Sequence, residues 1–148
     1  MQPPDIQFIE LEKTKFPLLN QFYKRVYKKG VACKDERVFI LKEKEIVCSG
    51  KLKTLDKQLL LTGIACAPEF RGQGYASLLI KKILFLQAQP VYCFPYAYLQ
   101  PFYSRLGFVE TGSQTVPDII SQKFYAYSKN RDLLLMVYSS LSKIDNKS

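Results

Sequence analysis

The sequence contains no histidine, and only four of its 148 residues are cysteines. Without histidine, the Ser-His-Asp and Cys-His catalytic arrangements are excluded, and so are the zinc sites that need imidazole ligands. The cysteines, Cys33, Cys48, Cys66 and Cys93, are far apart in the sequence and form no metal-binding pattern, so we expect no metal site. Three of them lie in apolar, strand-like segments, which favours buried free thiols in a reducing cytoplasm over disulfides.

Long hydrophobic runs are also missing. No apolar run approaches the roughly 20 residues that a membrane span needs. The N-terminal segment has no basic stretch followed by an apolar one, so we expect no signal peptide. These absences predict a cytoplasmic protein without a membrane partner.

Acidic residues are few: 13 against 22 basic residues, a net charge of +9. Such a charge favours anionic partners, which include nucleic acid, acidic lipid and small polyphosphates. The cations are scattered among acids, however, and no basic stripe or nucleic-acid motif is visible, so we expect no nucleic-acid partner.

Hydrophobic patterning predicts one domain over residues 1–148, with a frayed tail at about 142–148. The expected strands cover residues 5–10, 38–41, 46–53, 58–67, 91–94, 108–111 and 132–141. The expected helices cover residues 15–29, 74–89 and 100–106, and residues 112–132 are left unassigned. This order indicates an α+β fold with a mixed, mostly antiparallel sheet of about six to seven strands and helices on both faces.

Local signals give these elements their boundaries. Thr14 is expected to cap the first helix, and turns are expected near Glu43–Lys44 and at Asp56–Lys57. Gly63 interrupts an otherwise apolar central strand, which indicates a bulge or a close backbone approach.

The segment Arg71–Ala76, with the sequence RGQGYA, joins that strand to an amphipathic helix. The first turn of a helix has unpaired amides and the positive end of the helix dipole. Gly72 and Gly74 lack a Cβ, so an anion can reach these amides, and Arg71 adds a positive charge. The segment therefore predicts a phosphate or pyrophosphate site. It lacks the lysine of a Walker A loop and the third glycine and topology of a dinucleotide fingerprint.

Two segments resemble the GNAT superfamily, the Gcn5-related N-acetyltransferases. The first is "IACAPEFRGQGYASLLIKKIL", in which Arg71, Gly74 and Ala76 fill the family pattern [QR]-x-x-G-x-[GA]. The second is "LQPFYSRLGFVETG", about 30 residues later, and the expected order of elements also matches the family fold. The resemblance spans at least residues 38–138 and implies an acetyltransferase that uses acetyl-coenzyme A, with a homodimer as a family-level expectation.

The resemblance assigns roles to particular residues. The backbone at Ile64 and Cys66 would pair with the pantetheine arm, and the segment near Ala65 would direct an amide at the thioester carbonyl. The amides from Gln73 to Ala76, with Arg71 and Gly72, would hold the pyrophosphate. The expected coenzyme-binding residues are thus Ile64, Ala65, Cys66, Arg71, Gly72, Gln73, Gly74, Tyr75 and Ala76.

Tyr103 aligns with the general acid of the family. A phenol, with a pKa of about 10, is protonated near neutral pH and has a proton for the leaving thiolate. The alternative is that Tyr103 only packs against Phe102 and Phe108. No carboxylate lies on the central strand to serve as a base, so a water relay or a carboxylate from elsewhere, such as Asp118, remains open.

The sequence gives the fewest indications about the acceptor substrate. Many family members have Asn and Ala where this chain has Tyr96 and Leu99, so the Asn contact to the coenzyme is in doubt here. The acceptor site of the family draws on the regions 22–36 and 112–131, where Phe124, Tyr125 and Tyr127 either line the site or pack on a sheet edge. We expect a small-molecule amine or a peptide or protein amine, and the basic charge favours a neutral or acidic acceptor over a polycation. A non-catalytic module that binds coenzyme A as a sensor is the main alternative.

Overall fold

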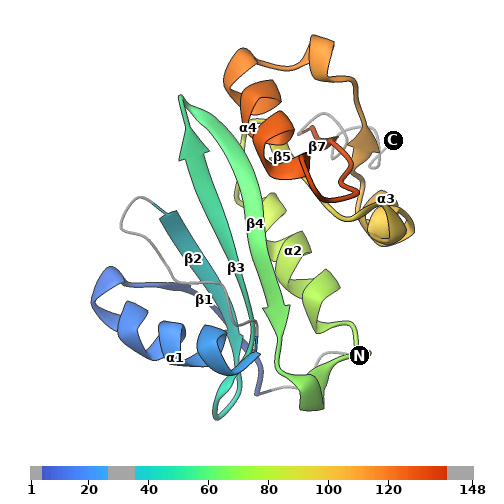
Figure 1. Ribbon diagram of the computed structural model, residues 1–148. Helices are drawn as coiled ribbons and strands as arrows, with labels where there is room; N and C mark the ends of the chain where they lie inside the picture. Colours follow the sequence, from blue (N-terminus) through green and yellow to red (C-terminus); the bar gives the residue numbers. More distant parts are fainter. Residues whose placement is uncertain (1–4, 27–35, 140–148) are drawn as a thin grey trace. The chain divides into compact units, whose positions relative to one another are not determined.

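The computed structural model describes residues 5–26 and 36–139 (Figure 1). Its strands are β1 (Gln7–Leu11), β2 (Glu36–Lys42), β3 (Ile46–Leu55), β4 (Gln58–Cys66), β5 (Val91–Cys93), β6 (Val109–Glu110) and β7 (Met136–Tyr138). Its α-helices are α1 (Phe16–Val26), α2 (Tyr75–Phe85), α3 (Gln100–Arg105) and α4 (Asp118–Ser128). The strands form one seven-stranded sheet in the order β1-β2-β3-β4-β5-β7-β6. β4 and β5 are parallel, whereas β1–β2, β2–β3, β5–β7 and β6–β7 are antiparallel. The predicted mixed, mostly antiparallel sheet is confirmed.

The chain groups into two compact units, which are described separately. The first comprises the described residues of Met1–Lys53 together with Thr62–Phe85, and the second comprises Thr54–Leu61 with those of Leu86–Ser148. In the first unit, α1 packs Leu19 and Tyr23 against Val38, Ile40 and neighbouring residues on one face of the strands.

The opposite face of the same strands receives α2. Gly50 of β3 lies directly beneath this helix: a Cβ at this position would lie 3.4 Å from the side chains of both Leu79 and Ile83. Both leucine and isoleucine are fully buried. The first unit therefore has helices on both faces of its strands, as the hydrophobic patterns predicted.

Two helix boundaries differ from the sequence prediction. Thr14 is no helix cap, because it lies inside a short 3-10 turn (Lys13–Lys15) that leads into α1 at Phe16, and the predicted end of this helix at Lys29 lies outside the described residues. α2 ends at Phe85 rather than at Gln89. The reason is that its buried stripe stops at Leu84, and the Gln89 side chain instead donates to the Lys57 carbonyl at 2.7 Å.

The second unit contains a helix that the sequence analysis left unassigned. α4 begins after Pro117 and buries Ile120 against Leu60, Tyr92 and Leu135, with Phe124 and Tyr127 packed on this cluster. Residues 120, 124 and 127 have helical spacing, but aromatic residues and the preceding Gly and Pro favoured strand or loop. β7 begins at Met136 rather than at residue 132, because Leu134 donates to the Pro95 carbonyl before the strand starts, and the predicted end at residue 141 lies outside the described residues.

Gly63 is a left-handed residue within β4. Its φ is 65°, and the hydroxyl of the buried Tyr23 donates to its carbonyl at 2.8 Å, with Ser49 Oγ 3.1 Å away. The Lys51 side chain fills the remaining space, because a Cβ on Gly63 would lie 3.2 Å from Lys51 Cδ. Of the two predicted alternatives at Gly63, the close approach to the backbone is confirmed.

We expect Gly63→Ala to lower the free energy of unfolding by about 1–3 kcal/mol, because alanine must adopt a positive φ and displace Lys51. Urea denaturation followed by circular dichroism measures the effect. Gly112→Ala is the matched control, since Gly112 has a φ of -85° and open space around it. Equal stabilities for the two variants would contradict the strain at Gly63.

Candidate functional site

The loop between β4 and α2 has the conformation that its glycines predict. A short 3-10 turn (Pro68–Phe70) precedes it, and Gly72 and Gly74 have φ values of 76° and 84°. A Cβ at either glycine would meet no atom within 4 Å. The loop is therefore open, and glycine is needed for its backbone conformation rather than for packing.

The start of α2 presents backbone donors beside this loop. The Leu78 amide donates to the Gly74 carbonyl at 3.0 Å, so the amides that precede it in the first turn have no partner within the helix. The exposed Arg71 lies next to them, and its Nε donates to the Cys66 carbonyl at 3.1 Å. Amides, helix dipole and guanidinium together can bind an anionic group such as a diphosphate.

Side chains on the loop hold its shape. Gln73 Nε2 donates to the Glu69 carbonyl at 3.1 Å, and Phe70 packs edge-to-face on Tyr75 with ring centroids 5.9 Å apart. The Glu69 carboxylate lies 3.7 Å from the Arg25 guanidinium of α1. This exposed pair contributes little stability. Glu69 is thus turned toward α1, consistent with a surface role rather than that of a base.

The backbone of β4 has one edge that its ladder with β5 does not cover. That ladder joins Leu59–Leu61 to Val91–Cys93, and β4 continues to Cys66. On the β3 side, the Ala67 amide donates to the Val47 carbonyl at 2.9 Å. Because amides and carbonyls alternate between the two edges of a strand, the Cys66 backbone points to the other edge, where Arg71 reaches its carbonyl. Ile64 is two residues earlier on that same edge.

Cys66 takes part in this site through its sulfur as well. The thiol of Cys48, on β3, hydrogen-bonds to the Cys66 sulfur and is the main reason that the pKa of Cys66 lies below its ordinary value. The positive charge of Arg71 and a hydrogen bond from the Ala76 amide act in the same direction, whereas burial opposes them. Among the predicted coenzyme-binding amides, that of Ala76 thus already has a sulfur acceptor.

The predicted coenzyme-binding residues, from Ile64 to Ala76, all belong to the first unit, whereas Tyr103 belongs to the second. Tyr103 lies in α3 and is 8% exposed. Its ring packs edge-to-face with Phe102 and Phe108, at centroid distances of 5.0 and 5.5 Å. The aromatic cluster that the sequence offered as an alternative therefore exists, and it holds the Tyr103 ring in one orientation.

The aromatic residues expected near the acceptor lie on α4 rather than on a sheet edge. Phe124 and Tyr127 pack on Phe94, at centroid distances of 5.4 and 5.8 Å, and belong to the core of the second unit. Tyr125 is exposed, and its hydroxyl is hydrogen-bonded to Ser113 at 2.8 Å.

Three further residues singled out in the sequence lie at or just before the starts of helices. Asp118 is exposed in the first turn of α4. Tyr96 forms an isolated bridge with Leu133 and stacks on Tyr98, and Leu99 follows in a short 3-10 turn before α3. Tyr96 thus has its own structural contacts where many family members carry Asn.

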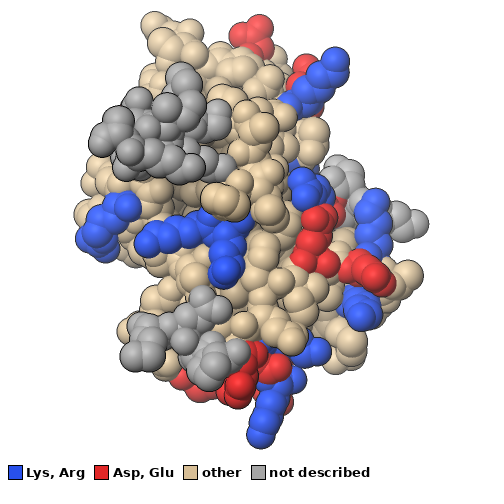
Figure 2. Space-filling view, turned by 180° about the vertical axis from the view of Figure 1, so that it is seen from behind, with Lys and Arg blue, Asp and Glu red and all other residues tan. Residues whose placement is uncertain are grey.

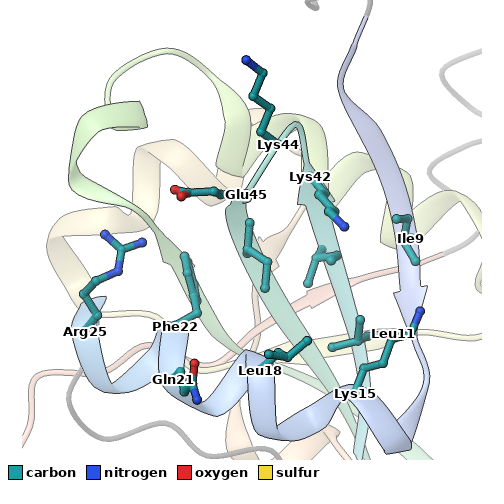
Figure 3. A pocket seen from close by; sticks show the side chains of 12 residues that line it. Ile9, Leu11, Lys15, Leu18, Gln21, Phe22, Arg25, Lys42, Lys44 and Glu45 are labelled. Atoms are coloured by element: carbon teal, nitrogen blue, oxygen red, sulfur yellow. The ribbon is translucent and has the colours of Figure 1, made fainter.

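The first unit also contains a cavity of about 760 Å³ beside α1 that the sequence analysis missed (Figure 3). Lys15 lines it from the 3-10 turn before α1 and Arg25 from α1 itself, and Lys42, Lys44 and Glu45 line it from the β2–β3 hairpin. The apolar lining consists of Ile9, Leu11, Leu18, Phe22, Ile40 and Ile46. Four cations and one carboxylate give the cavity a positive potential. No local motif marks it, since its residues come from three separate segments.

On the surface shown in Figure 2, basic side chains lie in several small groups with acidic side chains among them. Within residues 5–26 and 36–139, no helix is long and apolar enough to cross a membrane.

Several solved structures share this fold, and some of them are acetyltransferases. N-acetylglutamate synthase from Neisseria gonorrhoeae, complexed with coenzyme A and N-acetyl-glutamate, superposes with a TM-score of 0.70 at 11% identity. The match covers 93% of this chain but only 36% of the synthase, so this chain spans about a third of that protein's length. Escherichia coli ElaA gives a TM-score of 0.65 at 19% identity over 90% of this chain and 98% of its own. Spermidine/spermine N-acetyltransferase SpeG from Vibrio cholerae gives 0.63 at 17% identity over 97% and 98%.

Among curated proteins, none matches the sequence. The family model described as "Acetyltransferase (GNAT) domain" matches residues 34–110, just over half of the chain. That range includes β2 to β4, the glycine loop, α2 and α3. The chain therefore belongs to the GNAT family of acetyltransferases.

Proposed function

We propose that this protein is an N-acetyltransferase that transfers the acetyl group of acetyl-coenzyme A to a primary amine. The observation that carries the proposal is the open loop at Arg71–Gly74, which presents amides, a helix N-terminus and a guanidinium to an anion. The diphosphate of the coenzyme is the group that such a loop binds. Direct attack by the amine in a ternary complex requires no covalent enzyme intermediate.

The coenzyme is proposed to lie along β4. Its pantetheine amides would pair with the backbone of Ile64 and Cys66 on the edge beyond the β5 ladder, in the manner of an added strand. The thioester carbonyl would then accept a hydrogen bond from a backbone amide of the segment 63–65, where the left-handed conformation of Gly63 redirects the backbone. This role uses backbone atoms, so small apolar side chains suffice there.

Tyr103 is proposed to be the general acid. When the amine attacks the thioester, the carbon–sulfur bond breaks and coenzyme A leaves as a thiolate, which takes the Tyr103 proton. The edge-to-face contacts with Phe102 and Phe108 would fix the ring so that the hydroxyl keeps one direction. β4 carries no carboxylate that could serve as the base that removes the proton from the amine.

We propose a neutral or acidic acceptor. The chain carries a net charge of +9, and the cavity beside α1 places four cations against one carboxylate. A polyamine would be repelled by such a surface, whereas a carboxylate on the acceptor would be attracted. SpeG, a structural relative, is named for polyamine acceptors, so the fold alone does not decide this property.

Arg71→Gln should weaken acetyl-coenzyme A binding about tenfold. This loss is at the lower end of what a charge-assisted hydrogen bond contributes, because Arg71 is exposed. Calorimetry with acetyl-coenzyme A measures the dissociation constant. Lys81→Gln is the matched control: it removes the same charge from the exposed face of α2 and should leave affinity nearly unchanged. No binding to the unaltered protein would refute the proposed function.

Tyr103→Phe should reduce kcat by about 10²- to 10⁴-fold, the usual contribution of a general acid, while the affinity for acetyl-coenzyme A stays the same. Steady-state kinetics and calorimetry on one preparation separate the two quantities. Tyr98→Phe, at a residue that is 77% exposed, removes the same hydroxyl as a control. Full turnover by Tyr103→Phe would exclude its role as the acid.

The acceptor is tested by following thiol release from acetyl-coenzyme A with glutamate, phenethylamine and spermidine. We expect glutamate or phenethylamine to exceed spermidine in kcat/KM, with the glutamate preference falling as salt is added. A preference for spermidine would overturn the charge argument. No release with any amine, despite tight coenzyme binding, would favour the sensor over the enzyme.

A further inference from the structure

Cys48 and Cys66 lie directly opposite each other on neighbouring strands. The Ala67 amide donates to the Val47 carbonyl, and a Cβ on Gly50 would lie 2.6 Å from Ile64 Cδ1. Both observations give one antiparallel register, and this register pairs Cys48 with Cys66. Their side chains therefore point to the same face of the sheet, the face that α2 covers.

The pairing suits a disulfide. Because Val47 and Ala67 form a hydrogen-bonded pair, the next pair along the ladder, Cys48 with Cys66, is of the non-hydrogen-bonded type, with Cα atoms about 4.5 Å apart. That spacing is at the short end of the range of about 4.4–6.8 Å that disulfides span. The register places both side chains on one face of neighbouring strands, so a bond between the two sulfurs needs little backbone movement.

The two thiols are not equivalent. Cys48 is fully buried, whereas Cys66 is partly exposed. The hydrogen bond to Cys66 and burial raise the pKa of Cys48. The pKa of Cys66 is lowered by that hydrogen bond, by Arg71 and by the Ala76 amide at the start of α2. A thiolate at a helix N-terminus beside a cation is the arrangement that makes a cysteine reactive.

We propose that Cys48 and Cys66 form a hydroperoxide-reactive dithiol site, in which Cys66 is oxidised first and Cys48 then closes a cross-strand disulfide. The Cys66 thiolate attacks one oxygen of the hydroperoxide, the O–O bond breaks, and the leaving oxygen takes a proton to give water or an alcohol. The resulting sulfenic acid is attacked by Cys48. The S–O bond breaks, and the hydroxyl leaves as water with the proton of Cys48.

The order of these steps follows from the surroundings. Cys66 is partly exposed beside Arg71, whereas Cys48 is fully buried, so a hydroperoxide reaches Cys66 first. Cys93 offers an internal comparison, because burial alone raises its pKa well above the ordinary value. Cys93 is also 2% exposed and should not react.

One consequence rests on the proposed function. The Ala76 amide and Arg71, which hold the Cys66 sulfur, are also the groups proposed to bind the coenzyme diphosphate. A bound diphosphate would compete with the thiolate for the same positive charge and favour the protonated thiol. Acetyl-coenzyme A should therefore slow the oxidation of Cys66 about fivefold or more, and by linkage the two effects are reciprocal.

The dithiol is tested on the folded, ligand-free protein with stoichiometric hydrogen peroxide and non-reducing peptide mapping. Trypsin separates the two cysteines, because Lys51, Lys53 and Lys57 lie between them. We expect one cross-linked peptide pair, Cys48 with Cys66, that dithiothreitol releases, in the unaltered protein and in Cys93→Ser alike. Cross-links that involve other cysteines only, or reaction of Cys66 no faster than Cys93, would overturn the proposal.

Trapping with dimedone tests the order of the steps. In Cys48→Ser the sulfenic acid has no resolving thiol, so dimedone should label Cys66. In Cys66→Ser, dimedone should leave Cys48 unlabelled. Label on Cys48 in that variant would contradict the assignment. Circular dichroism checks the fold of each variant, and the map of the unaltered protein decides the pairing independently.

The coenzyme effect is measured separately, as the initial rate of cross-linking with and without saturating acetyl-coenzyme A, which carries no free thiol. Binding without any slowing would refute the competition at Ala76. Absence of binding in calorimetry would refute the coenzyme proposal, whereas the cross-link in the ligand-free protein would still establish the dithiol site.

Discussion

The hydrogen bond from Tyr23 to the Gly63 carbonyl is the contact on which the proposed site depends. It holds Gly63 in a left-handed conformation inside β4, and residues other than glycine do not adopt this backbone conformation easily. The two-residue turn at Asp56–Lys57, with φ values of 51° and 71°, by itself would pair Ala65 with Cys48. At the end of the β3–β4 ladder that lies far from this turn, the observed pairing is shifted by one residue from the pairing that the turn would set. Gly63 lies between the turn and the shifted pairs. The shift brings Cys66 opposite Cys48.

The N-terminus of α2 is the electrostatic centre of the first unit. Its amides, the helix dipole and Arg71 form one concentration of positive charge between an open loop and a sulfur. Two anions suit this position, a diphosphate from the loop side and the Cys66 thiolate from the sheet side. A single piece of structure would then connect coenzyme occupancy with thiol reactivity, because both anions draw on the same donors.

Much of the backbone geometry around the proposed site could be predicted from the sequence, because its signals are local. The glycines of the loop, the turn at Asp56–Lys57 and the interruption at Gly63 each reflect a backbone conformation that few residues adopt, and all three have positive φ values. α4 was missed because Phe124, Tyr125 and Tyr127 are residues that favour strands, and only burial of Ile120 against β4 and β5 makes the segment a helix. The early end of α2 escaped notice because apolar residues continue beyond its buried stripe, at the exposed Phe85 and Leu86.

The sequence by itself determined the family, the order of most elements and the loop that would hold a diphosphate, because each depends on residues that are neighbours along the chain. Only the tertiary structure decided that Cys48 faces Cys66, that Tyr23 holds Gly63, and that Lys15 shares one cavity with the lysines of the β2–β3 hairpin. These contacts join residues 18 to 40 positions apart in the chain. Strand register and helix packing bring them together, and no local pattern records either.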